Sequence, residues 1–147
     1  MPGGPYDHAV SRAASAFHSY VRRSDDRRLE RTLGSPRGLR FLFGRAARAY
    51  RPDVMPALAG DLAFDLRLAD GTHRPWTVAV GPAGATARAG EAASPALLVR
   101  TGVADFIRIA AGEIDTGGAL LDGRLDIEGD FDVAQQLGAM FGRSGPY

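Results

Sequence analysis

The sequence predicts an α+β fold in which a five-stranded mixed sheet is covered on one face by helices. The first observation is a set of short stretches between residues 60 and 101 in which apolar and polar residues alternate, as in half-buried strands. The second is the pair of flanking regions, where apolar residues recur every three or four positions, as in amphipathic helices. Packing the apolar sides of both patterns together gives an α+β sandwich.

Residues 1–57 are predicted to form an N-terminal helical segment. The glycine- and proline-rich residues 1–6 are expected to be disordered. Helical spacing then predicts one helix from Asp7 to about Leu33, which the turn at residues 34–36 ends. A second helix follows, with one continuous apolar stripe formed by Leu39, Leu42, Phe43, Ala46, Ala47 and Tyr50.

Four strands are predicted next. Residues 62–69 alternate cleanly, and the turn residues Asp70 and Gly71 lead into a strand over about residues 73–80. A weaker strand is expected over residues 85–89. The fourth, within ALLVRT, is apolar on both faces, which favours a central position in the sheet.

The closing forty residues contain two further helices and a strand. Thr101 is expected to cap a helix with a stripe of Val103, Phe106, Ile107 and Ala110, which Gly112 ends. Residues 114–122 are small and loop-like, with one helical turn at 119–121. A fifth strand follows, and Asp130 caps a last helix that buries Val133, Leu137, Met140 and Phe141. The intervening helix predicts that the fourth and fifth strands are parallel, joined by a right-handed crossover.

The composition is that of an ordinary globular chain. The length of 147 residues suits one domain that buries roughly 70% of its unfolded surface. No apolar run approaches the roughly 18 residues of a membrane span, and the N-terminus has no secretory pattern. The absence of cysteine excludes disulfides and thiol chemistry, and fits a cytoplasmic protein.

Charge is unevenly distributed along the chain. Residues 1–51 hold eleven arginines and four acidic residues, a formal charge of +7, and the remainder carries −6. The arginines either form a solvated basic face or dock on an anionic membrane surface or an acidic partner. Nucleic acid is disfavoured, because no aromatic residues interleave with the basic ones and the net charge is only +1.

No catalytic residue, metal or cofactor is predicted. The histidines His8, His18 and His73 are too dispersed for a metal site, and no serine stands in a nucleophile context. The glycine-rich stretches lack the spacing of phosphate loops. A carboxylate pair for acid–base chemistry stays open, although most acidic residues suit helix caps or outward strand positions.

The apolar residues are the remaining candidates for function. They form either a plain core or the lining of a cavity, and all of them are expected to point into the layer between sheet and helices. Small residues between Gly112 and Gly123 suit a cover over an opening. The last helix is also expected to move to admit a ligand.

The second half of the chain resembles the sterol carrier protein type 2, or sterol-binding domain, family. The resemblance rests on LLVRTGVADFIRI and on the pattern Ala-Leu-x-x-Gly-x-Leu-x-Ile-x-Gly-Asp from Ala119 to Asp130, ahead of a helix that ends in Leu137 and Phe141. The strand run AFDLRLADGTHRPWTVAVGPAGATARAGEAASPALLVR also matches, Trp76 included. The resemblance covers about residues 58–142, and residues 1–57 match more loosely. The lysine-free, arginine-rich composition favours a bacterial member.

This resemblance implies a sterol carrier protein-like domain over residues 58–147, forming one compact unit with residues 1–57. It implies a hydrophobic tunnel that binds or transfers a fatty acid, an acyl chain, or a sterol-like or polyketide- or terpenoid-like lipid, without a cofactor. The residues expected to line the tunnel are Phe64, Leu66, Trp76, Val78, Phe106, Ile107, Leu120, Leu121, Phe131, Leu137, Met140 and Phe141.

Two other functions stay open. One is a small enzyme that uses the same apolar cavity for cyclisation or isomerisation in secondary metabolism. Tyr50, His18 or Asp105, if buried there without a structural partner, would favour it. The other is an interaction module whose basic helices dock a partner or an anionic surface.

Overall fold

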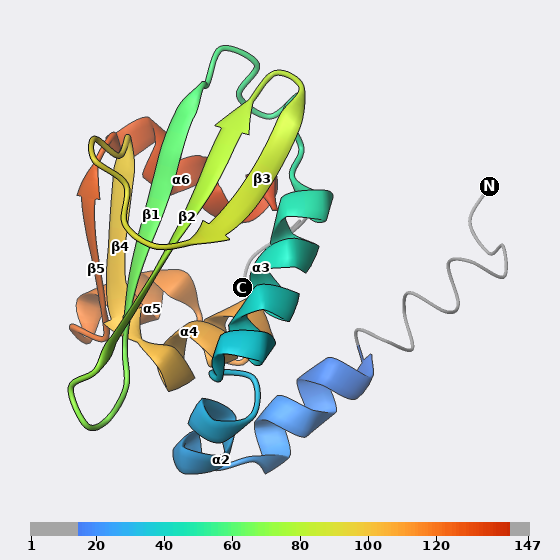
Figure 1. Ribbon diagram of the computed structural model, residues 1–147, viewed down its shortest axis with the longest axis vertical. Helices are drawn as coiled ribbons and strands as arrows, with labels where there is room; N and C mark the ends of the chain where they lie inside the picture. Colours follow the sequence, from blue (N-terminus) through green and yellow to red (C-terminus); the bar gives the residue numbers. More distant parts are fainter. Residues whose placement is uncertain (1–14, 142–147) are drawn as a thin grey trace, which may run out of the picture.

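The computed structural model describes residues 15–141, in which a five-stranded sheet in the order β3-β2-β1-β4-β5 carries helices on one face (Figure 1). The predicted α+β fold and the central place of the fourth strand are confirmed. The strands are β1 Gly60–Arg67, β2 His73–Gly81, β3 Gly84–Ala89, β4 Leu97–Gly102 and β5 Leu125–Gly129.

The sheet is mixed, but the parallel pair is not the predicted one. β4 pairs parallel with β1, while β5 pairs antiparallel with β4. The expected crossover from β4 to β5 is wrong because α4 and α5 both lie at the end of the sheet where β4 ends (Figure 1). The chain therefore re-enters the sheet at that end and runs back. The parallel pair is made instead by residues 90–96, which cross the outer face of the sheet from β3 to β4.

The N-terminal helices are separate elements. Residues 15–23 are helical, α2 spans Asp26–Arg31 and α3 spans Pro36–Ala49. The single helix predicted to Leu33 is wrong, because the Asp25 carboxylate accepts a hydrogen bond from the backbone N–H of Arg28 at 2.8 Å and begins a new helix. The parts of that prediction on residues 1–14, His8 among them, lie outside the described residues.

Three helices follow β4. They are α4 Val103–Ala110, α5 Thr116–Leu121 and α6 Phe131–Met140. Asp130 caps α6 as predicted, but Thr101 does not cap α4. Thr101 ends the pairing of β4 with β5 instead, and its hydroxyl donates to the backbone carbonyl of Arg124 at 2.8 Å. No helix within residues 15–141 is long and apolar enough to cross a bilayer.

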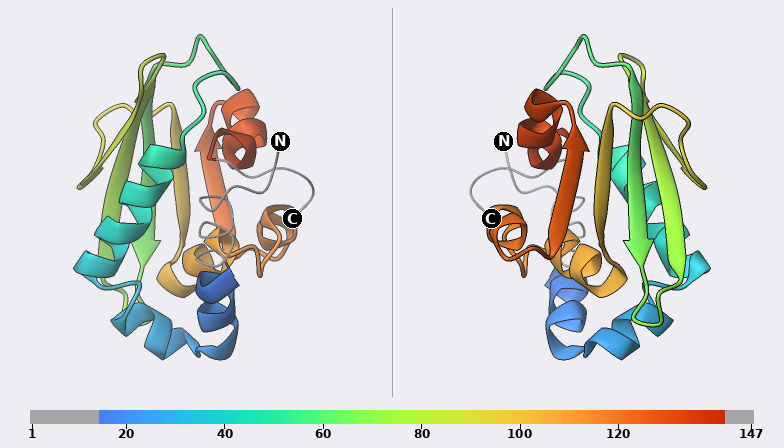
Figure 2. Two further views of the ribbon diagram at one scale, coloured as in Figure 1. Left: turned by 90° about the vertical axis from the view of Figure 1, so that its right-hand side faces the viewer. Right: turned by 90° about the vertical axis from the view of Figure 1, so that its left-hand side faces the viewer.

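The core lies between the sheet and its helices. In the side views α3 lies beside β3, whereas α5 and α6 lie beside β5 (Figure 2). The first strands turn their alternating apolar residues inward, which buries Leu62, Phe64, Leu66, Trp76, Val78 and Val80. Gly34 is needed for this packing, since a Cβ there would lie 2.4 Å from Cγ1 of Val103 on α4.

Arg108 of α4 fixes the N-terminal helices to this layer. Its guanidinium donates to the backbone carbonyls of Val21 and Ser24 and to the carboxylate of Asp26, at 2.8–3.2 Å. Glu113 completes the cluster at 3.2 Å. Burial opposes the charged form, but the hydrogen bond to Asp26 and the charge of Glu113 outweigh it, so the pKa of Arg108 is raised. The arginine is therefore a fixed cationic clamp.

Candidate ligand-binding site

Four aromatic rings form the centre of the helix-covered layer. Phe43 of α3 stacks on Trp76 of β2 and on Phe106 of α4, with ring centroids 4.9 and 5.2 Å apart. Phe64 of β1 meets Phe43 edge-on at 5.3 Å. These four residues are called the aromatic cluster below. They occupy the space between sheet and helices that a guest molecule would need.

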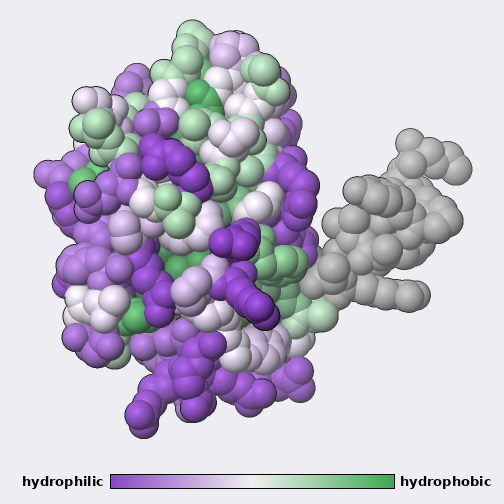
Figure 3. Space-filling model, in the orientation of Figure 1, coloured by the Kyte–Doolittle hydropathy of each residue, from purple (hydrophilic) through white to green (hydrophobic). Residues whose placement is uncertain are grey.

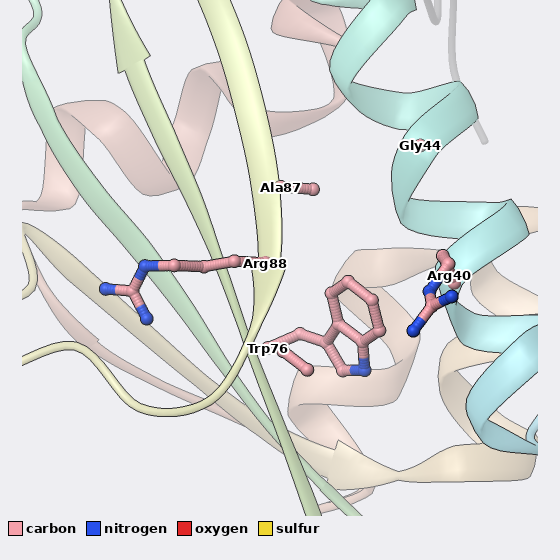
Figure 4. Close-up of a pocket in the computed structure, with 6 residues that line it drawn as sticks. Arg40, Gly44, Trp76, Ala87 and Arg88 are labelled. Atoms are coloured by element: carbon pink, nitrogen blue, oxygen red, sulfur yellow. The ribbon is translucent and has the colours of Figure 1, made fainter.

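A hollow of about 360 Å³ opens at the surface beside this cluster, between α3 and β3. Trp76 lines it together with Arg40, Gly44 and Ala87 (Figure 4). The Arg88 side chain points away from α3, while Arg40 stands near the indole. A Cβ at Gly44 would have no atom within 4 Å, so the helix leaves open space there. Trp76 therefore belongs both to the interior and to the wall of a surface opening.

Tyr50 brings a polar group into the same layer. It follows α3 on its inner stripe, and only 7% of the residue is exposed. Its hydroxyl is buried and has no hydrogen-bond partner among the described residues. Burial raises the pKa of Tyr50, so the group stays a neutral O–H donor at physiological pH.

Most residues predicted to line a tunnel lie in the interior. Phe64, Leu66, Trp76, Val78, Ile107 and Met140 are buried. The partly buried Phe106, Leu137 and Phe141 pack against them. Their role in ligand binding stays a prediction, and residues 15–141 show no open tunnel in place of the aromatic cluster.

Three residues of the prediction do not point inward. Leu120, Leu121 and Phe131 are 43%, 91% and 71% exposed. The six-residue helix α5 buries only Ala119, so its two leucines face away. Phe131 is the first residue of α6, ahead of the turn that buries Val133. The expectation that these side chains face the layer is wrong.

Sequence reasoning did not select Phe43, Arg40 or Gly44 as site residues. Phe43 was visible in the apolar stripe of the second predicted helix, but nothing in one sequence shows that this stripe meets Trp76. The opening at Gly44 carries no sequence signal, because a helical glycine has no pattern that distinguishes open space from close packing.

Most polar side chains considered for catalysis have structural partners. Nδ1 of His18 lies 3.0 Å from the carbonyl oxygen of Ala111, and Nδ1 of His73 lies 2.8 Å from Oδ1 of Asp65. Asp105 is half-buried in the first turn of α4. Residues 15–141 contain no group of three side chains able to hold a metal ion.

These observations define an α+β domain with an aromatic interior that opens to the surface beside one helix. The sequence profile of the SCP-2 sterol transfer family matches residues 42–142, so the chain belongs to this family. Its function is accordingly the non-covalent binding or transfer of an apolar small molecule. The match begins inside α3. No curated protein matches the chain.

Solved structures share this fold. A crystal structure of Sterol Carrier Protein 2 Like 2 from Aedes aegypti is 24% identical with a TM-score of 0.56, over 67% of this chain and 92% of that one. The palmitated form of the same mosquito protein is 22% identical with a TM-score of 0.57, over 74% and 97%. The sec-alkylsulfatase Pisa1 from Pseudomonas sp. is 17% identical with a TM-score of 0.52, over 69% of this chain but only 16% of the enzyme.

Proposed function

We propose that this chain is a carrier that holds one apolar molecule along the inner face of α3, among the aromatic cluster. The observation that carries the proposal is the position of Trp76, which stacks on Phe43 inside the layer and lines the hollow outside it. A molecule that enters between α3 and β3 meets the interior at this ring. Apolar ligand sites are generally concave and lined by such side chains.

The proposed lining keeps the inward-facing residues of the prediction and adds Phe43. It consists of Phe43, Phe64, Leu66, Trp76, Val78, Phe106, Ile107, Leu137, Met140 and Phe141. Because these side chains are packed against one another, the ligand has to displace some of them. Rotation of the aromatic side chains would supply the space.

A fatty acyl chain is the first ligand class to test. The aromatic and aliphatic lining suits hydrocarbon, and the mosquito neighbour with this fold is palmitated. Sterol-like and polyketide- or terpenoid-like molecules have the same apolar character and form the comparison set.

Filling the hollow tests the proposal. Gly44→Leu places a side chain in the open space beside Trp76. Leucine also favours the helix by about 1 kcal/mol relative to glycine. Gly138→Leu is the matched control, since a Cβ at Gly138 of α6 also meets no atom within 4 Å. Displacement of a fluorescent fatty acid and native mass spectrometry give the readout.

The expected result is micromolar displacement by wild type and by Gly138→Leu, with at least tenfold weaker binding by Gly44→Leu. Because Trp76 is the sole tryptophan of the chain, its fluorescence should change when ligand binds. No displacement at micromolar lipid and no lipid retained by wild type would refute the carrier function. Equal binding by all three proteins would place the ligand elsewhere.

The enzymatic alternative has one observation in its favour. Tyr50 is buried with no hydrogen-bond partner in the described part of the chain, as a reactive group in an apolar cavity would be. His18 instead contacts Ala111, and Asp105 lies half-buried in the first turn of α4. A lone neutral hydroxyl serves binding better than acid–base catalysis, which needs a group whose pKa is near the working pH. The carrier function is therefore preferred.

An anionic membrane surface is the partner we propose for the basic helices. On α3 the arginines Arg37, Arg40, Arg45 and Arg48 are exposed, and this helix contains no acidic residue. Phe41 stands among them, 51% exposed. Cations beside an exposed aromatic ring suit a bilayer surface with anionic headgroups. Hydrophilic residues also gather at the end of the molecule where α2 lies (Figure 3).

Vesicle co-sedimentation tests this partner. We expect binding to phosphatidylglycerol vesicles that is lost at high salt, and little binding to phosphatidylcholine vesicles. Arg45→Gln with Arg48→Gln should weaken it without changing fatty-acid displacement. Binding to an acidic protein but not to anionic vesicles would replace the membrane with a protein partner.

We also propose that residues 1–57 and 58–147 act as one unit, located in the cytoplasm. The packing of Phe43 from the first segment against Trp76 and Phe106 from the second supports the first statement. The absence of cysteine fits the second, because the chain needs no oxidising compartment. A single cooperative unfolding transition of the full chain tests the first.

A further inference from the structure

Tyr50 carries a hydroxyl into the hydrophobic core between the sheet and its helices. Phe43 and Tyr50 lie seven positions apart, two helical turns, so the two rings emerge from the same side of α3. The Phe141 ring faces Tyr50 with centroids 5.5 Å apart. Beside it the backbone N–H of Arg51 donates to the carbonyl of Met140 at 2.6 Å, so the end of α6 closes over this point.

A buried hydroxyl without a partner is costly for a folded protein. Such a group loses its hydrogen bonds to water and receives none in return. Phenylalanine at position 50 would fill the same space without this loss. The hydroxyl is thus best explained by an acceptor that arrives with a ligand.

The local charge limits what this acceptor can be. Burial alone raises the pKa of Tyr50, with no contribution from an arginine. Arg51 is half-exposed and turned toward Asp53, at 3.6 Å. Arg40 stands about 15 Å away along the helix, at 1.5 Å per residue. Neither of these two arginines would compensate the burial of a free carboxylate beside Tyr50.

We propose that the Tyr50 hydroxyl is the polar contact for the ligand and donates a hydrogen bond to a neutral oxygen of an otherwise apolar molecule, such as an ester, ketone or alcohol. The inference rests on the proposed carrier function and deepens it. The hydrocarbon extends from Tyr50 along α3 toward the hollow at Gly44, about 9 Å away along the helix axis. The ring of Phe141 moves aside when the ligand binds.

Two ligands that differ in their oxygen atoms test the inference. Methyl palmitate and n-heptadecane have the same number of carbons, and only the ester can accept a hydrogen bond. Their affinities are measured by displacement of diphenylhexatriene from wild type, Tyr50→Phe and Tyr20→Phe. Tyr20→Phe is the matched control, because that hydroxyl is at the surface and donates to Oγ1 of Thr32.

Tyr50→Phe should weaken the binding of methyl palmitate roughly tenfold and leave the affinity for n-heptadecane unchanged. A tenfold change is about what one hydrogen bond provides. Tyr20→Phe should change neither affinity. Infrared spectra of methyl palmitate labelled with carbon-13 at the carbonyl should show a hydrogen-bonded C=O stretch in wild type that is lost in Tyr50→Phe. This readout reports on the bond itself.

Equal affinities of wild type and Tyr50→Phe for the ester, or an unchanged C=O stretch, would overturn the inference and leave the carrier function intact. Equal losses for both ligands would also overturn it, because the hydroxyl would then act through the structure alone. If wild type binds neither ligand nor any fatty acid, the carrier function fails and the inference fails with it.

Discussion

The two sides of the helical layer differ in how they meet the sheet. On the β3 side, α3 inserts Phe43 among three other rings and is buried along its inner stripe. On the β5 side, α5 and α6 leave Leu121 and Phe131 largely exposed. Aromatic packing thus fixes α3, while the contacts of α5 and α6 with β5 are sparser.

This difference indicates which side carries stability and which side has freedom to move. Regions with few buried apolar contacts open at low free-energy cost, and ligand-gating elements are drawn from such regions. The exposed side chains of Leu121 and Phe131 contribute little to the stability of the fold in their present positions. We expect them to contact a lipid during transfer, whereas the aromatic cluster stabilises the fold.

Truncation of Phe43 should have the largest effect. Phe43→Ala removes three ring contacts from the centre of the core. We expect a loss of about 3–5 kcal/mol in the free energy of unfolding, measured by urea denaturation. A loss under about 1 kcal/mol would show that the α3 side is not the fixed one.

Removal of the Arg108 clamp should follow. Arg108→Ala leaves the carbonyl of Ser24 without its side-chain donor and Glu113 without its cation. The carbonyl of Val21 keeps only the backbone N–H of Ser24 as donor. We expect a loss of about 2 kcal/mol, less than for a fully buried pair because Asp26 is mostly exposed. The control is Arg100→Ala on the open face of the sheet, where the ion pairs with Asp126 and Glu128 are exposed and a much smaller loss is expected.

Tyr50→Phe should stabilise the unliganded protein by about 1 kcal/mol, because it removes a buried hydroxyl that has no partner among residues 15–141. The two proteins should also differ in alkali. Since burial raises the folded pKa of Tyr50 above 10.0, the folded state holds its proton more tightly than the unfolded state. Its contribution is present below pH 10 and is lost as pH rises through the folded pKa.

Urea melts from pH 8 to 11 check this sign. Wild type should lose stability above pH 10 more steeply than Tyr50→Phe, and the two curves should run parallel below about pH 9. A steeper loss in Tyr50→Phe, or a variant less stable than wild type at pH 8, would mean that the hydroxyl has a structural partner.

Leu121→Ala should have the smallest effect on stability, under about 0.5 kcal/mol, because the side chain is 91% exposed. The substitution should instead affect the rate of lipid transfer. We expect slower movement of a fluorescent fatty acid from the protein to acceptor vesicles, at unchanged affinity. A stability loss of 2 kcal/mol or more would show that the β5 side is packed as firmly as the α3 side.

Much of the architecture followed from local patterns. The alternation of Leu62, Phe64 and Leu66 predicted β1, and Asp130 marked the start of α6, since both signals depend on neighbouring residues alone. The direction of β5 could not be predicted from local patterns. It depends on the end of the sheet at which α4 and α5 lie, because the chain re-enters the sheet from there. Arg108 shows the same limit, as its partners are up to 87 positions away.

The candidate site was predictable in composition and not in detail. Trp76 and Phe106 were selected because apolar residues at strand and helix spacing point inward. Leu121 was selected on the same grounds and is exposed, because a helix as short as α5 has too few turns to bury a full stripe. The Tyr50 hydroxyl has no partner among the residues that the structure describes, and the spacing of the sequence gives no sign of this.

The location of the ligand tests the central claim most directly. Protein labelled with carbon-13 at its aromatic rings, mixed with unlabelled palmitate, allows nuclear Overhauser contacts between lipid and protein to be assigned. We expect contacts from the acyl chain to the rings of Phe43, Trp76 and Phe106. Contacts confined to Phe131, or no contacts to any ring at saturating lipid, would contradict a carrier whose ligand lies within the aromatic cluster.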